Sequence, residues 1–216
     1  MCHIGERKMN DIRIIKIGQE AIFELVYETL IDQTEELFRV IDVCHVQSAF
    51  GMNDETGRFW FAVHDDRLIY DEERQAYICG SAYQYGHLPL PDPEDFWVES
   101  SEDPWRYRSI DLNGGVPRRA GKVKRLGTEL RMIQLTPDKM AELVNRTIYK
   151  NRKLYFGLRS TKNTEFQSLW NPQTGEYACA IFPRGKNPSD LEGILRSHPI
   201  TTESMFQRGR YSVIKL

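Results

Sequence analysis

The chain has 216 residues, of which 40% are hydrophobic and 28% are charged, and its formal net charge is −2. This length is sufficient to bury a core, as one domain or as two small ones. No apolar run approaches the roughly 20 residues of a membrane-spanning helix. The cysteines are far apart and form no C-x-x-C pair. We therefore expect a cytoplasmic protein without structural zinc, whose free thiols are Cys2, Cys44, Cys79 and Cys179.

The first predicted module covers residues 12–112. It follows an N-terminal extension (1–11) that lacks the apolar core of a signal peptide, and in which Met9 is an alternative start to Met1. A mostly apolar strand precedes an amphipathic helix, and a Pro-, acid- and aromatic-rich insertion precedes the last strand. The expected elements are a strand at 12–17, a helix at about 19–33, strands at 37–41, 46–50 and 59–63, one or two strands within 67–80, the insertion at about 82–104, and a strand at 106–112.

A basic, Gly-rich linker at 113–129 leads into the second predicted module, 130–216. Its helix has a strong start, with Thr136 as N-cap and Pro137 in the first helical position. The expected elements are a strand at 130–135, a helix at 137–150, strands at 154–158, 165–169 and 176–182, a short helix ending at about 196, and a strand at 211–216.

The two modules match each other at an offset of 118 positions. Between 12–63 and 130–181 we count eleven identities in 52 pairs, where ordinary composition gives about three by chance. The last strands match at an offset of 104. This pattern predicts an α+β fold made of an internally duplicated β-α-β-β-β-(loop or short helix)-β module, with antiparallel sheets, helices packed on one face and two pseudo-symmetric halves. The alternative is that common strand and helix patterns coincide.

Charge separates the modules. Residues 12–112 hold 8 Lys or Arg against 21 Asp or Glu, whereas residues 130–216 hold 14 against 7. Opposite charge indicates different partners for the two halves, or attraction between them.

Basic residues cluster in the linker, at the end of the second helix and just beyond it, with Tyr149, Tyr155 and Phe156 interleaved. Basic residues with aromatics are typical of phosphate binding and base stacking. Solvated linker cations and a favourable helix C-terminus are the alternative explanation. The nucleic-acid-binding candidates are Arg118, Arg119, Lys122, Lys124, Arg125, Lys150, Arg152, Lys153, Arg159 and Lys162.

The insertion supplies the candidates for contact with a protein partner, because long ordered loops are often functional. These are Tyr85, Phe96 and Trp97. The alternative for this segment is a lid that packs on its own module.

No catalytic motif is present. His64-Asp65-Asp66 is better explained as a turn than as a metal site, and Cys79 with His87 lacks an acid that would orient the histidine. We expect no metal, no cofactor and no membrane partner, and we assign no catalytic residue.

Two main hypotheses follow. The first is a non-enzymatic binding or regulatory protein, such as an inhibitor or immunity-type protein, that recognises a protein partner. The second is a nucleic-acid-binding or RNA-processing protein that uses the linker and the second module. In element order alone, that module resembles the ferredoxin-like modules found in tandem in CRISPR RNA-processing proteins, although it lacks their glycine-rich loop. A third possibility is a small-molecule sensor with a cleft between the modules.

Overall fold

The computed structural model describes residues 9–41, 43–53, 55–66, 68–71, 76–79, 87–89, 107–111, 118–119, 126, 129–201 and 209–215. The chain divides into two compact units. Unit 1 comprises residues 1–26 and 140–216, and unit 2 comprises residues 27–139. Helices α1 (Gln19–Asp32) and α3 (Pro137–Lys150) each continue from one unit into the other.

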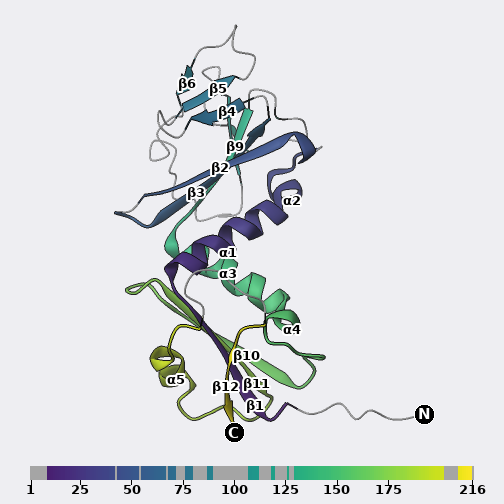
Figure 1. Cartoon of the computed structure of the whole chain (residues 1–216), viewed down its shortest axis with the longest axis vertical. Helices are drawn as coiled ribbons and strands as arrows, with labels where there is room; N and C mark the ends of the chain where they lie inside the picture. The colour runs from purple at the N-terminus through teal and green to yellow at the C-terminus, as the bar shows by residue number, and fades with distance from the viewer. Residues whose placement is uncertain are drawn as a thin grey trace, which may run out of the picture. The chain divides into compact units, whose positions relative to one another are not determined.

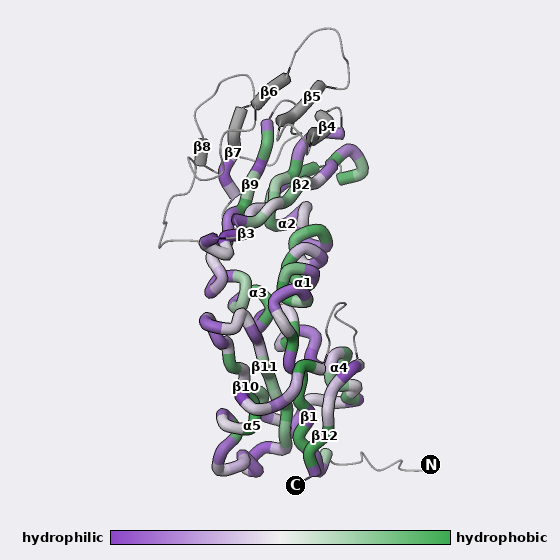
Figure 2. The backbone as a smooth tube through the Cα atoms, turned by 60° about the vertical axis from the view of Figure 1, so that its left-hand side comes forward, coloured by the Kyte–Doolittle hydropathy of each residue, from purple (hydrophilic) through white to green (hydrophobic). Residues whose placement is uncertain are grey.

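Unit 1 contains a four-stranded antiparallel sheet of order β10-β11-β1-β12. The strand nearest the N-terminus, β1, therefore lies between two strands from the C-terminal half, as the purple strand among green and yellow ones in Figure 1. Figure 2 shows β1 as a largely hydrophobic stretch, in keeping with this central place. The strands are β1 (Asp11–Ile17), β10 (Thr164–Asn171), β11 (Glu176–Pro183) and β12 (Ser212–Lys215).

Helices cover both faces of this sheet. On one face, α5 (Leu191–Ser197) packs through Leu191 and Leu195 on a cluster that includes Ile12, Ile14 and Phe182. The intervening residues of the same strands point to the other face, where they meet α3. Tyr177 Oη, for example, donates to Asn145 Oδ1 at 2.9 Å. The prediction that helices pack on one face only is therefore wrong for unit 1. The reason is that β1 and β11 are buried on both sides and need a cover on each.

Unit 2 contains a five-stranded antiparallel sheet of order β2-β3-β9-β7-β8 and a three-stranded sheet of order β4-β5-β6. Strand β9, which follows the linker, lies between β3 and β7 of the N-terminal half. For β4, β5, β6 and β8 the structure describes the backbone alone. The strands are β2 (Val46–Asn53), β3 (Arg58–Asp65), β4 (Leu68–Asp71), β5 (Ala76–Cys79), β6 (His87–Pro89), β7 (Arg108–Asp111), β8 (Arg118–Arg119) and β9 (Glu129–Leu135).

Aromatic side chains form much of the described core of unit 2. Phe61 lies with its ring centroid 5.7 Å from that of Phe38 and 5.7 Å from that of Tyr27. Tyr107 stacks on Phe38 with a centroid separation of 6.3 Å. The second half of α1 and the short helix α2 (Thr34–Phe38) are thereby fixed to the sheet, and a 3₁₀ turn, η1 (Val43–His45), leads into β2.

Local signals explain the element ends. Thr136 Oγ1 accepts a hydrogen bond from Lys139 N at 3.3 Å, which confirms the predicted N-cap of α3. Asp190 Oδ1 accepts from Gly193 N at 3.0 Å and starts α5 in the same way. Gly57 and Gly175 have φ of 64° and 63° in the turns before β3 and β11. Such positive φ angles favour glycine.

Two predicted strands do not form. The segments 37–41 and 154–158 start within α2 and α4 (Arg152–Tyr155) and continue through the residues that end these helices. Arg39 and Gly157 follow in the left-handed region, with φ of 52° and 58°. A short apolar run has no clear period, so sequence does not separate a strand from one helical turn here.

The element bounds repeat at the predicted offset. Strand β9, helix α3 and strands β10 and β11 begin and end 118 positions after β1, α1, β2 and β3. The registers repeat as well, because Arg13 lies opposite Ile181 and Arg131 lies opposite Val63. Strands β7 and β12 differ by 104 positions and pair with β9 and β1 in the same register.

An arginine in each unit makes the same set of contacts. Arg131 Nη1 donates to Phe38 O and Arg39 O, at 2.5 and 2.8 Å, and Nε donates to Glu129 Oε1 at 3.0 Å. Its guanidinium also lies 4.9 Å from the ring centroid of Tyr107.

In unit 1, Arg13 Nη1 donates to Phe156 O and Gly157 O, at 2.6 and 3.3 Å, and Nε donates to Asp11 Oδ2 at 3.3 Å. Its guanidinium lies 4.8 Å from the ring centroid of Tyr211. In both units a cation thus meets the carbonyl end of a short helix and holds that helix against the sheet.

Candidate binding surfaces

Five of the predicted nucleic-acid-binding residues lie on one surface of unit 1, which we call the basic face. They come from the last residue of α3, from α4 and from the segment that follows α4. Four of the side chains are exposed, and that of Arg152 is half-buried. The basic face consists of Lys150, Arg152, Lys153, Arg159 and Lys162.

Arg152 organises this surface. Its Nη1 donates to Tyr149 O at 2.8 Å, and its Nη2 donates to Thr161 Oγ1 at 3.4 Å. The second bond ties the segment that carries Arg159 and Lys162 to helix α4. The guanidinium also lies 4.3 Å from the ring centroid of Tyr149, in cation–π contact.

Tyr149 is the apolar centre of the basic face. Half of its surface (50%) is exposed, as is half of that of Leu154. Its ring meets Phe166 of β10 edge-on at 5.4 Å between centroids, so its position is fixed from the sheet side. Arg152 covers one side of the ring, so that side is closed to a stacking base.

Two of the five positions of the basic face carry the opposite charge 118 residues earlier. Asp32 stands where unit 1 has Lys150, Glu35 stands where it has Lys153, and Ile31 stands where it has Tyr149. Ile31 is exposed to 41%. We call the exposed carboxylates of this surface the acidic face: Glu28, Asp32, Glu35 and Glu36.

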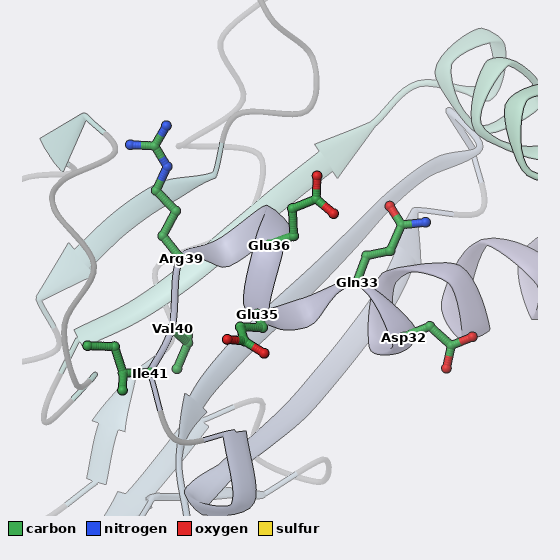
Figure 3. A pocket seen from close by; sticks show the side chains of 7 residues that line it. All are labelled: Asp32, Gln33, Glu35, Glu36, Arg39, Val40 and Ile41. Carbon is green, nitrogen blue, oxygen red and sulfur yellow. The ribbon is translucent and has the colours of Figure 1, made fainter.

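A shallow, open hollow of about 560 Å³ lies in the acidic face and is lined by Asp32, Gln33, Glu35, Glu36, Arg39, Val40 and Ile41. Figure 3 shows Gln33, Glu36 and Arg39 directed to one side of α2 and Glu35 directed to the other. Three carboxylates against one guanidinium give the hollow a negative balance, which suits a cationic side chain.

The acidic face was not singled out from the sequence. The composition shows an acidic excess over residues 12–112 without locating it. The alignment of the two modules locates it, because Asp32 then aligns with Lys150 and Glu35 aligns with Lys153. Comparing the charges of the aligned pairs, and not only their identities, would have identified this surface.

The other predicted binding residues lie largely outside the described part. Arg118 and Arg119 form β8, whose backbone pairs with Arg108 and Ser109 of β7. Their side chains are not described, and the linker residues Lys122, Lys124 and Arg125 lie outside the described residues. So do the partner-contact candidates Tyr85, Phe96 and Trp97.

Three described groups with catalytic potential are engaged in a contact or buried. His64 is 2% exposed, and burial lowers its pKa below the usual 6.5, while its Nδ1 contact with Asp65 O acts in the opposite direction. Asp66 Oδ2 pairs with His45 Nδ1 at 3.2 Å. Burial raises the pKa of the Cys179 thiol well above its usual range, so it is a poor nucleophile. Among the described residues, no group of three or more His, Cys, Asp or Glu side chains is arranged to hold a metal ion.

Comparison of the chain with protein-family models, with curated proteins and with solved structures gives no match. Within the part of the chain that the structure describes, no helix is both long and apolar enough to cross a membrane.

Proposed function

We propose that this chain is a non-enzymatic, protein-binding protein built on a duplicated α+β module. Four observations support the duplication: the coincident element bounds, the repeated strand registers, the repeated arginine contacts and the paired positive φ angles of Gly57 and Gly175. An arginine bonded to carbonyls at matched positions in both units supports duplication over a coincidence of common patterns.

The observation that carries the binding function is the charge reversal at equivalent, exposed positions. Each face carries an exposed apolar residue, Ile31 or Tyr149, together with charges that are mostly of one sign. An apolar centre with a charged rim is characteristic of protein–protein interfaces. Two faces of this kind, on helices with matching bounds, favour a protein that binds a basic surface through one face and an acidic surface through the other.

Nucleic-acid binding is the second candidate, and it is favoured by one observation. Arg152 gathers the basic face into one surface, as phosphate binding requires. Arg152 on one side of the Tyr149 ring and the carboxylates of the acidic face favour the protein partner instead.

The test uses the full chain and two charge-reversed variants, Lys150→Glu/Lys153→Glu and Asp32→Lys/Glu35→Lys. Each protein is immobilised and exposed to extract of its source cells, and to a mixed RNA and DNA pool at about 50 and 200 mM salt. We expect a protein that is captured by the wild type and lost with one of the face variants. Capture that neither variant changes would contradict the proposal. Nucleic acid that binds with a steep salt dependence and is lost with Lys150→Glu/Lys153→Glu would establish the second candidate.

A further inference from the structure

The basic face and the acidic face have the same backbone framework. Helices α3 and α4 repeat the bounds of α1 and of most of α2, and the residue that follows each short helix pair, Arg39 or Gly157, has nearly the same φ. Lys150 and Lys153 therefore occupy positions in α3 and α4 that correspond to those of Asp32 and Glu35 in α1 and α2. The two surfaces thus have opposite charges on helices with matching bounds.

The charges on both faces are available to a partner. Asp32, Glu35, Lys150 and Lys153 are exposed, and within the described residues none of them forms an ion pair. Elsewhere in unit 1 some exposed charges are paired, as Arg196 is with Glu192 at 2.7 Å. The charges of the two faces are instead free to meet charges on a partner.

We propose that the basic face of one molecule binds the acidic face of a second copy of this chain. In such a contact Tyr149 meets Ile31, while lysines of one face meet carboxylates of the other. One face is negative and the other is positive at the aligned positions, so the charges attract even if the docking register shifts by a turn. This inference rests on the proposed function and names the partner of the same surfaces.

Each molecule carries one face of each kind. Association stops at a dimer where a two-fold rotation lets both pairs of faces meet at once, and it otherwise continues until the rotation between copies closes a ring. The pairs lie at the molecular surface, where salt screens charge, so association weakens as ionic strength rises.

The test is a charge exchange, read as the mass of the full chain by sedimentation over a range of protein concentrations at about 50 and 500 mM salt. At low salt the wild type is expected to exceed its monomer mass of 25.3 kDa as concentration rises. Asp32→Lys/Glu35→Lys leaves two lysines against Glu28 and Glu36 and so removes the net negative charge of the acidic face, and Lys150→Glu/Lys153→Glu leaves three cations against two carboxylates and so removes most of the positive charge of the basic face. Each variant alone is expected to self-associate at least about tenfold more weakly than the wild type.

Restoration makes the test specific. An equimolar mixture of the two variants is expected to associate, because the positive face of one meets the negative face of the other. The chain with all four substitutions is expected to associate as weakly as either variant alone, since neither of its faces then keeps a strong net charge. The matched control is Lys186→Glu/Lys215→Glu, which changes net charge equally at exposed positions outside both faces and leaves association unchanged.

A wild type that stays monomeric at both salt concentrations overturns the inference, as does association that the face variants do not reduce or that their mixture does not restore. These outcomes are separable from failure of the proposed function. If the wild type is monomeric but a face variant still loses a captured protein, the binding function stands and the partner is a different protein.

Discussion

At the scale of single residues, the two equivalent arginines differ in burial. Arg131 is fully buried, whereas the side chain of Arg13 is 19% exposed. Both join a strand to the carbonyl end of a short helix. Removing a buried charge leaves its partners without compensation in a low dielectric, whereas a partly exposed site allows water to replace the lost bonds.

We therefore expect Arg131→Met to lower the free energy of unfolding by about 3 to 5 kcal/mol, measured by urea denaturation. Arg13→Met, its matched control, is expected to cost about 1 to 3 kcal/mol. Because much of the larger loss comes from the buried Glu129 carboxylate, Glu129→Gln/Arg131→Met should recover part of it. Equal losses for the two arginines would show that burial does not distinguish these sites.

His64 makes stability depend on pH. Burial lowers its pKa in the folded chain below 6.5, chiefly by desolvation, and the contact and charge of Asp65 offset this in part. Between the folded pKa and about 6.5, the unfolded chain binds more protons than the folded chain does. The free energy of unfolding is therefore expected to fall as the pH drops below about 6.5.

Urea titrations across this pH range should show a weaker dependence for His64→Gln than for the wild type. The pKa of His198 is also lowered, by burial and by the charge of Lys16, so His64→Gln/His198→Gln should weaken the dependence further. An unchanged pH profile for the single and double variants would be inconsistent with this assignment.

At the scale of elements, most strands and helices follow from the sequence. Helix α3 has its predicted bounds, and the strands predicted at 12–17, 46–50 and 59–63 lie within β1, β2 and β3. The short helices α2 and α4 did not follow, because four or five residues carry too little periodicity. The helix on the second face of the unit 1 sheet does not follow from the sequence. Strand β11 is apolar on both sides, and periodicity alone does not show that each side is covered by a helix.

The residues that end α2 and α4 test the repeat at this scale. Arg39 takes a left-handed conformation where its counterpart is Gly157, so Arg39→Gly is expected to raise the free energy of unfolding by up to about 1 kcal/mol. Gly157→Ala should lower it by about 1 to 2 kcal/mol, since φ is 58° and a Cβ would lie 3.2 Å from Tyr211 Oη. Thermal and urea unfolding measure both changes. Destabilisation by both substitutions would mean that the Arg39 side chain contributes more than its backbone strain costs.

At the scale of the whole molecule, strand pairing is what the sequence does not decide. Strands β1 and β9 have equivalent registers, and each fits beside β3 or β11 by its apolar pattern. Local periodicity is the same whichever partner is chosen, so it cannot tell a strand that stays in its own module from one that is exchanged. For the same reason, the modules 12–112 and 130–216 remain a prediction from the repeat. The units observed in the structure are divided differently.

Cutting the chain in the linker tests this exchange. A fragment 1–120 retains β1 to β8 but lacks β9, the strand between β3 and β7, and a fragment 121–216 lacks β1, the strand between β11 and β12. We expect the two fragments to co-purify when expressed together with a tag on one of them, because each supplies a central strand of the other's sheet. Alone, neither is expected to give a folded monomer. If fragment 121–216 alone sediments as a monomer and unfolds cooperatively, then β9 has taken the place of β1 beside β11, and the modules 12–112 and 130–216 are independent folding units.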